Sequence, residues 1–175
     1  MSLPLASGTY AIDPMHSHLG FSVTHLGISL VRGTFDTFTG SLTVGAGLAD
    51  TSVAIDAEMA SVNSGNSMRD GHLHGGDFFD VAAHPQMTFR STSAAAAGPG
   101  FSLTGDLTIK GVTQPVTLQA TFNGTAESPM DKSVRNGFAA SGTISRSAFG
   151  ITYGAPMVSD DVKLVLDVQF VSPTA

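Results

Sequence analysis

The chain has 175 residues, of which 42% are hydrophobic and 13% are charged, and its formal net charge is −6. Eight Lys and Arg residues against 14 Asp and Glu leave no basic stripe for phosphate groups, which excludes nucleic acid as a natural partner. No cysteine is present, so disulfides, thiolate metal sites and cysteine nucleophiles are excluded as well.

The length fits one domain over residues 1–175 with a substantial core. No stretch of about 18 apolar residues occurs, so we expect no membrane-spanning segment. Before the first strand-like segment, residues 9–12, there is neither a cationic region nor an apolar run. We therefore expect no signal peptide and a cytoplasmic location.

In the first third of the chain, apolar and polar residues alternate, which predicts β-strands with one buried face. One such strand covers residues 18–25. Residues 29–44 are long enough for two strands, or for one strand bent at Gly33 or Gly40. A further half-buried strand is predicted over residues 53–60.

The alternation stops over residues 63–84, the one long interruption in the pattern. Residues 64–73 are expected to form one or two helical turns that end at Gly75 and Gly76. The wider segment 70–89 gathers three Asp, three His and a Phe-Phe pair. Such a density predicts a metal site, a catalytic site, or a lid over an apolar interior.

Strand patterning resumes at Met87 and is expected to fade into a turn over residues 94–100. Residues 101–109 and 116–122 then form a predicted hairpin around Gly111. Each of its arms alternates between large apolar and polar or small side chains, so one face of the hairpin is expected to be buried.

After a polar loop over residues 127–136, two more strands are predicted, at 138–146 and 162–170. The count is eight or nine strands, several of about ten residues, joined mostly by short turns. No helices alternate with the strands, so a parallel sheet is disfavoured. An antiparallel barrel or sandwich is therefore predicted.

The inward positions of these strands carry mostly Phe, Leu, Val and Ile, interrupted by small residues. In a barrel of about eight strands, small inward residues either fit the taper of the barrel or leave room for one small ligand. With 11 Phe, 2 Tyr and no Trp, such an interior suits a hydrocarbon. Each buried methylene contributes about 0.8 kcal/mol, so a long tail can bind without specific polar contacts.

Two inward positions are polar. Arg146 is expected either to hold the phosphate or carboxylate of a head group, or to form a buried ion pair with an Asp of the insertion, Asp70, Asp77 or Asp80. His25 is expected either near the same head group or as a hydrogen-bonded core histidine.

Two His-x-His pairs, His16 with His18 and His72 with His74, keep a metal site open as an alternative. An enzyme is disfavoured, because the chain has no nucleophile elbow, phosphate-binding glycine loop or His-Glu-x-x-His motif. A barrel without any ligand, serving as a structural or interaction module, is a third alternative.

Six motifs occur in order along the chain: residues 13–17 leading to Phe21 and His25; 33–35; 70–89; 105–113; 137–150; and 159–162. In these residues the chain resembles the YceI-like family, polyisoprenoid-binding proteins with an extended lipocalin-like barrel. The resemblance covers nearly all of residues 9–171.

The resemblance implies an all-β fold: an extended, antiparallel, eight-stranded, lipocalin-like barrel with one short helical insertion. It implies non-catalytic binding, transport or storage of a long-chain amphiphile of polyisoprenoid, quinone-like or fatty-acid type. We expect no cofactor besides such a lipid, no catalytic residues and no metal ligands. Exposed strand edges make a homodimer plausible.

Within this fold the insertion is expected to act as a lid, with its two adjacent Phe side chains closing apolar surface. The side chains expected to contact the lipid are Phe21, Val23, His25, Phe35, Phe78, Phe79, Phe89, Leu107, Phe138, Ile144, Arg146 and Leu164.

Overall fold

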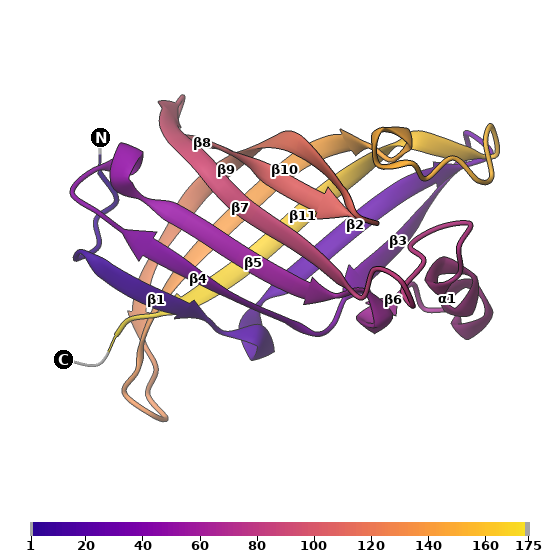
Figure 1. The fold of residues 1–175 in the computed structure, drawn as a ribbon. Coiled ribbons are helices and arrows are strands. Elements are labelled where there is room, and N and C mark those ends of the chain that lie inside the picture. Colours follow the sequence, from indigo (N-terminus) through magenta and orange to yellow (C-terminus); the bar gives the residue numbers. More distant parts are fainter. Residues whose placement is uncertain (1, 174–175) are drawn as a thin grey trace.

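A computed structural model describes residues 2–173, which form one antiparallel sheet of eleven strand segments and one α-helix (Figure 1). The strands are β1 (Gly8–Ile12), β2 (His18–His25), β3 (Ser29–Phe35), β4 (Phe38–Val44), β5 (Ser52–Glu58), β6 (Val62–Asn63), β7 (Gln86–Ala97), β8 (Gly100–Ile109), β9 (Val112–Glu127), β10 (Val134–Ser145) and β11 (Val158–Val171). The helix is α1 (Ser67–His74), and short 3₁₀ helices cover Pro14–His16, Leu48–Asp50, Met59–Ser61 and Ser147–Phe149.

Eight of these strands close a barrel. They pair in the order β1-β4-β5-β7-β8-β9-β10-β11, and β1 pairs back onto the end of β11. The other three, β2, β3 and β6, extend the sheet beyond the ring, because β2 pairs with the first half of β11, β3 pairs with β2, and β6 pairs with β3. This confirms the prediction of an extended eight-stranded antiparallel barrel.

The extension ends without closing. Of β3, only Thr34 and Phe35 pair with β6, and within the part of the chain described β6 has no second strand partner. The predicted helical insertion follows directly: α1 begins after Asn66, whose side chain accepts a hydrogen bond from the Arg69 amide, and ends at Gly75. Figure 1 shows α1 at the end of the barrel opposite both chain termini.

The segment 29–44 forms two strands, but its break falls at residues 36–37 and not at Gly33 or Gly40. At the break the Asp36 amide donates to the Ser61 carbonyl, outside the main ladder. Gly33 lies inside β3, and the Phe21 ring packs over it. An ideal Cβ at this position would lie 2.4 Å from Phe21 Cζ. The glycine relieves a side-chain clash instead of bending the strand.

Two loops are shorter than the sequence indicates. The β7–β8 turn is only residues 98–99, because Ala94 to Ala97 continue to pair with β8 despite the low strand preference of alanine. The polar loop 127–136 shrinks to residues 128–133. The predicted hairpin at Gly111 is confirmed, and both turn residues, Lys110 and Gly111, have the positive φ angles of a type I′ turn.

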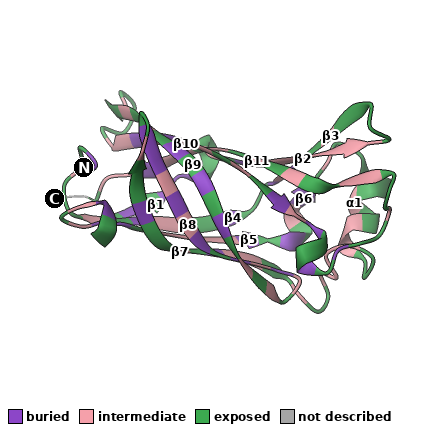
Figure 2. Cartoon of the chain, turned by 90° about the horizontal axis from the view of Figure 1, so that it is seen from above, coloured by how far each residue is buried: buried purple, intermediate pink, exposed green. Residues whose placement is uncertain are grey.

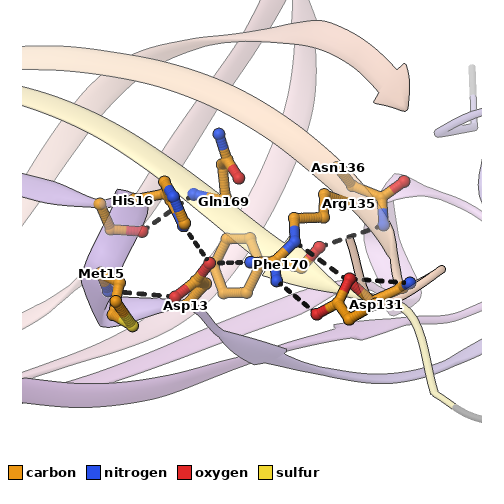
Figure 3. Close-up of polar contacts among 10 residues, drawn as sticks. Asp13, Met15, His16, Asp131, Arg135, Asn136, Gln169 and Phe170 are labelled. Atoms are coloured by element: carbon orange, nitrogen blue, oxygen red, sulfur yellow. Dashed lines mark hydrogen bonds and ion pairs between the residues drawn. The ribbon is translucent and has the colours of Figure 1, made fainter. Parts of the chain in front are cut away.

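The end that carries the termini is held by buried polar groups (Figure 3). Asp13 is buried and accepts from Arg135, from His16 Nδ1 at 2.7 Å and from the Met15 amide at 3.0 Å. Beside it, the fully buried Asn136 donates to the Phe170 carbonyl at 3.2 Å. These contacts join the turn after β1 to strands β10 and β11.

The packing differs between the two ends. Along β8 nearly every second residue is buried, whereas β2 and β3 towards α1 are mostly half-buried or exposed. Figure 2 shows the same gradient, with buried positions over the central strands and fewer around α1. The interior is therefore filled at the terminal end and less filled at the α1 end.

Candidate functional site

The interior of the barrel at the α1 end contains a cavity of about 440 Å³. Its walls come from strands β2, β3, β5 and β7–β11, and its cover comes from the segment of α1 and the loop before β11. Most lining side chains are apolar, and the volume lies within the range of small-molecule sites.

Eleven of the twelve side chains expected to contact a lipid line this cavity: Phe21, Val23, His25, Phe35, Phe78, Phe79, Phe89, Leu107, Ile144, Arg146 and Leu164. They come from six strands and two loops, so the barrel brings together residues that lie up to 143 positions apart in the chain. That they contact a ligand stays a prediction.

Phe138 is the exception, and it does not line the cavity. Its ring packs against Phe122, Phe170 and Phe101 at centroid distances of 5.1, 5.9 and 6.3 Å. This cluster fills the barrel at the terminal end. Alternation along β10 identifies the inward side of the strand correctly, but it carries no information on height along the barrel axis.

The inward glycines do not create the open volume. A Cβ on Gly33 would meet the Phe21 ring, one on Gly105 the Phe89 ring at 2.5 Å, and one on Gly142 the Leu118 side chain at 2.8 Å. Each small residue accommodates a large neighbour. The cavity instead lies between the large side chains of the strands, the insertion and the β10–β11 loop.

Sequence reasoning missed the contribution of the loop between β10 and β11. Ile151, Tyr153 and Met157 line the cavity, although no alternation marks them. The sequence did carry a signal that this loop faces an apolar interior, because residues 147–159 contain no charged side chain.

Arg146 is buried, and it holds this same loop. Its guanidinium donates to four backbone carbonyls: Ser159 from Nε at 2.9 Å, Ile151 and Tyr153 from Nη1 at 3.1 and 2.7 Å, and Val158 from Nη2 at 3.0 Å. The expected ion pair with an Asp of the insertion is therefore wrong. The carbonyls of an irregular loop need donors, and one arginine supplies them.

Asp160 completes the support of the loop. Its carboxylate accepts from Ser145 Oγ at 2.5 Å and from the Ser147 amide at 2.9 Å. These hydrogen bonds, with a smaller effect of the Arg146 charge, hold the pKa of Asp160 below its usual value of 3.8.

The Asp160 contacts predict a pH-dependent difference between the wild type and Asp160→Asn. A depressed pKa in the folded state stabilises the fold above pH 3.8 and loses that effect as pH falls through the folded-state value. At pH 7 the variant should melt at a lower temperature, and the gap should close progressively below about pH 3.8. Thermal unfolding from pH 7 to pH 2.5 measures this, and a gap that does not change with pH would contradict it.

The insertion covers the cavity through aromatic contacts. His72, Phe78 and Tyr153 form a triad with ring centroids 5.0 to 5.5 Å apart, which joins α1 to the β10–β11 loop. Deeper in the barrel, the Phe79 ring lies 5.9 Å from Phe35, which lies 5.6 Å from Phe21. Two groups of packed rings thus line the cavity, one between the lid and the β10–β11 loop and one between the lid and strands β2 and β3.

Polar groups of the insertion serve its own backbone and its neighbours. Asp70 accepts from the Ser64 amide and hydroxyl, and the Ser64 hydroxyl bond is the main reason that its pKa is lowered. Lys110 Nζ, on the β8–β9 turn, donates to the Gly76 carbonyl at 2.7 Å. Asp77 lies 3.0 Å from His72 Nε2. These contacts hold the lid in place, and they do not bring several acidic and basic side chains together into a catalytic arrangement.

The histidine pairs of the metal alternative do not assemble. His16 binds Asp13 at the terminal end, whereas His18 lies on the outer face of β2 over Gly20. His72 and His74 belong to α1. Within residues 2–173 no group of three or more His, Cys, Asp or Glu side chains could hold a metal ion.

His25 ends β2 at the cavity rim, and its ring makes no hydrogen bond to the described part of the chain. This places a polar side chain without a partner where the cavity reaches the mouth. Across residues 2–173, no helix combines the length and the hydropathy needed to cross a bilayer.

Comparison with known proteins gives a consistent result. Residues 10–170 match the family described as the YceI-like domain. A UPF0312 protein of Yersinia pestis is 38% identical over 163 residues, which cover 91% of this chain and 84% of that protein. A UPF0312 protein of Ectopseudomonas mendocina is 37% identical over 164 residues, covering 91% and 85%.

Solved structures share the fold. Burkholderia cenocepacia BcnA gives a TM-score of 0.81 at 27% identity over 90% of this chain and 98% of its own. A YceI protein of Campylobacter jejuni gives 0.74 at 31% identity over 86% and 90%. A polyisoprenoid-binding domain from Saccharophagus degradans gives 0.70 at 16% identity over 94% and 98%, a likeness of fold alone.

Proposed function

Because the chain belongs to the YceI-like family, we propose that it is a non-catalytic binding protein that holds the hydrocarbon tail of a long-chain amphiphile inside the barrel. The observation that carries this proposal is the cavity of about 440 Å³ with a nearly wholly apolar lining. A solved structure of the same fold is described as a polyisoprenoid-binding domain, which supports the same class of ligand.

The distribution of polar groups supports one orientation of the ligand. The polar side chains among the lining residues are His25, Ser64, Arg69, His72, Arg146 and Tyr153. All of them belong to the end of β2, the insertion or the β10–β11 loop, which surround the mouth. An amphiphile would therefore place its tail towards the filled terminal end and its head group at the mouth.

His25 is the best candidate for direct contact with the head group, because its ring has no partner and lies at the rim. The guanidinium of Arg146 already donates to four carbonyls, so its main role is to position the loop. The tail class remains a long hydrocarbon of isoprenoid, quinone-like or fatty-acid type, because each buried methylene contributes about 0.8 kcal/mol whatever its detailed structure.

A protein that carries or stores such a lipid must release the lipid chemically unchanged, and the groups around this cavity are consistent with that. Two of the carboxylates near the mouth support the backbone and its serines: Asp160 accepts from Ser145 and Ser147, and Asp70 accepts from Ser64. Ser64 lines the cavity and donates its hydroxyl to Asp70, but the lowered pKa of Asp70 makes that carboxylate a weak base. We therefore propose binding without chemical conversion.

Native mass spectrometry of the purified protein, with organic extraction of the same sample, tests the proposal. We expect a fraction of the protein to carry one copy of a lipid, recovered intact in the extract. If the protein is free of lipid and also fails to bind a fluorescent fatty acid and a polyprenol, the proposed function is wrong.

A further inference from the structure

The mouth of the cavity carries most of the exposed apolar surface. Nine large hydrophobic side chains are exposed in residues 2–173, and six of them lie around the mouth: Leu26, Ile28 and Leu30 in the β2–β3 hairpin, Met68 on α1, and Tyr153 and Met157 before β11. Single exposed hydrophobic residues are ordinary on protein surfaces, but a cluster at one end marks an interaction surface.

The hairpin and the loop form one surface. The Leu26 amide donates to the Met157 carbonyl at 2.7 Å, and the Thr24 amide donates to Ser159 Oγ. Tyr153 and Met157 also line the cavity, so the apolar surface continues from the outside into the barrel. We call Leu26, Ile28, Leu30, Tyr153 and Met157 the apolar rim.

We propose that the apolar rim docks the protein onto the surface of a phospholipid bilayer, with the tip of the β2–β3 hairpin inserted among the lipids. This inference rests on the proposed function, because a carrier of a bilayer-resident amphiphile must receive its ligand at a membrane. Figure 1 shows the hairpin, the β10–β11 loop and α1 together at the end away from both termini.

The hairpin tip can enter an apolar medium at low cost. Residues 19–31 and 147–159 contain no Asp, Glu, Lys or Arg. Within the turn, the Leu26 amide donates to the Met157 carbonyl and the Ile28 amide donates to the His25 carbonyl, so two of the amides that would be desolvated are already paired. Ile28 is 84% exposed and Leu26 is 56% exposed, which leaves their side chains free to insert.

The size of the rim favours a bilayer over a second copy of the chain. A stable protein interface takes about 20 to 30 residues from each partner, whereas the apolar rim offers five side chains from the hairpin and the β10–β11 loop. Insertion of a few large apolar side chains is enough for reversible membrane binding, which scales with the apolar area that is buried.

Charge around the mouth also defines the kind of membrane. Four Asp side chains belong to the segments around the mouth: Asp70 and Asp77 in the insertion, and Asp160 and Asp161 at the start of β11. Arg69, Lys110 and Arg146 offset only part of this charge, three positive groups against four Asp. Docking should therefore be driven by apolar contact and should not depend on anionic lipid.

Flotation of the full chain with phosphatidylcholine vesicles tests the docking. We expect the wild type to float with the vesicles. Leu26→Asn/Ile28→Thr should bind the vesicles at least about tenfold more weakly, because two large apolar side chains can no longer insert into the bilayer. Asn suits position 26, where φ is 51°. The matched control is Met130→Thr, since Met130 is 95% exposed at the opposite end and should not matter.

The outcomes separate this inference from the proposed function. Adding phosphatidylserine, or raising the salt concentration, should leave binding within about twofold. The proposed membrane docking is wrong if the wild type does not float, or if Leu26→Asn/Ile28→Thr floats as well as Met130→Thr. It is also wrong if sedimentation shows that the double substitution dissociates a dimer. Fatty-acid binding without vesicles should survive the double substitution; if the wild type floats but holds no lipid, the proposed function fails and the docking stands.

Discussion

Leu164→Trp is expected to reduce the affinity for a long-chain lipid at least about a hundredfold while the barrel stays folded. Leu164 lies on the inward side of β11, is only half-buried and lines the cavity. An indole there would occupy space that the tail needs. Displacing three or four methylenes, at about 0.8 kcal/mol each, accounts for a loss of this size.

The adjacent residue provides the matched control. Val165 is 50% exposed on the outer face of the same strand, so Val165→Trp adds the same side chain without entering the cavity. Titration with a fluorescent fatty acid should show near wild-type affinity for Val165→Trp. Full affinity for Leu164→Trp would mean that the tail does not occupy this cavity. The thermal midpoint of both variants checks that the fold is retained.

Gly142→Phe, the substitution that small inward residues suggest from the sequence, is not a suitable test of the cavity. A Cβ at Gly142 would lie 2.8 Å from Leu118 Cδ2 and 3.2 Å from the Thr117 carbonyl. A phenyl ring there would overpack the wall between β9 and β10 and would destabilise the fold. A loss of binding could then not be assigned to a blocked cavity.

Arg146→Met is expected to lower the free energy of unfolding by about 3 to 5 kcal/mol, because four carbonyls lose their donor and each unpaired buried group costs about 1 to 3 kcal/mol before the loop relaxes. The carbonyls belong to Ile151, Tyr153, Val158 and Ser159. Methionine keeps much of the apolar stem, so the change isolates the hydrogen bonds.

Urea denaturation of the wild type and the variant measures this difference. Arg32→Met is the control, since the Arg32 side chain is exposed on β3 and makes no hydrogen bond or ion pair within residues 2–173. This substitution should change stability by less than about 0.5 kcal/mol. Arg146→Lys should recover only part of the loss, because an ammonium has three donors and no planar fork. Equal stability of Arg146→Met and Arg32→Met would refute the role given to Arg146.

Most of the strand pattern could be predicted because alternation is a local property. Phe21 and Leu164 are inward for the same reason that their neighbours Ser22 and Val165 are outward, and no knowledge of the fold is needed to see it. The turn at Gly111 was equally readable, since a type I′ hairpin needs residues that tolerate positive φ.

The site was predictable only in part. Phe138 was assigned to the cavity although it fills the opposite end, because side-chain parity does not give a position along the barrel axis. The partners of Arg146 were missed because they are backbone carbonyls of a loop whose path depends on the whole barrel. Tyr153 and Met157 were missed because loop residues follow no period.

The sequence by itself determined the strand faces and the helical insertion, since these follow from local periodicity and turn chemistry, whereas the eight-stranded barrel was what the family resemblance implied. Only the tertiary structure decided which part of the interior stays open. The volume left near Leu164 depends on how side chains from eight distant strands meet, and the space beside the inward glycines Gly33, Gly105 and Gly142 is taken by Phe21, Phe89 and Leu118. Local pattern sets the direction of each side chain, but packing between strands sets the space that remains.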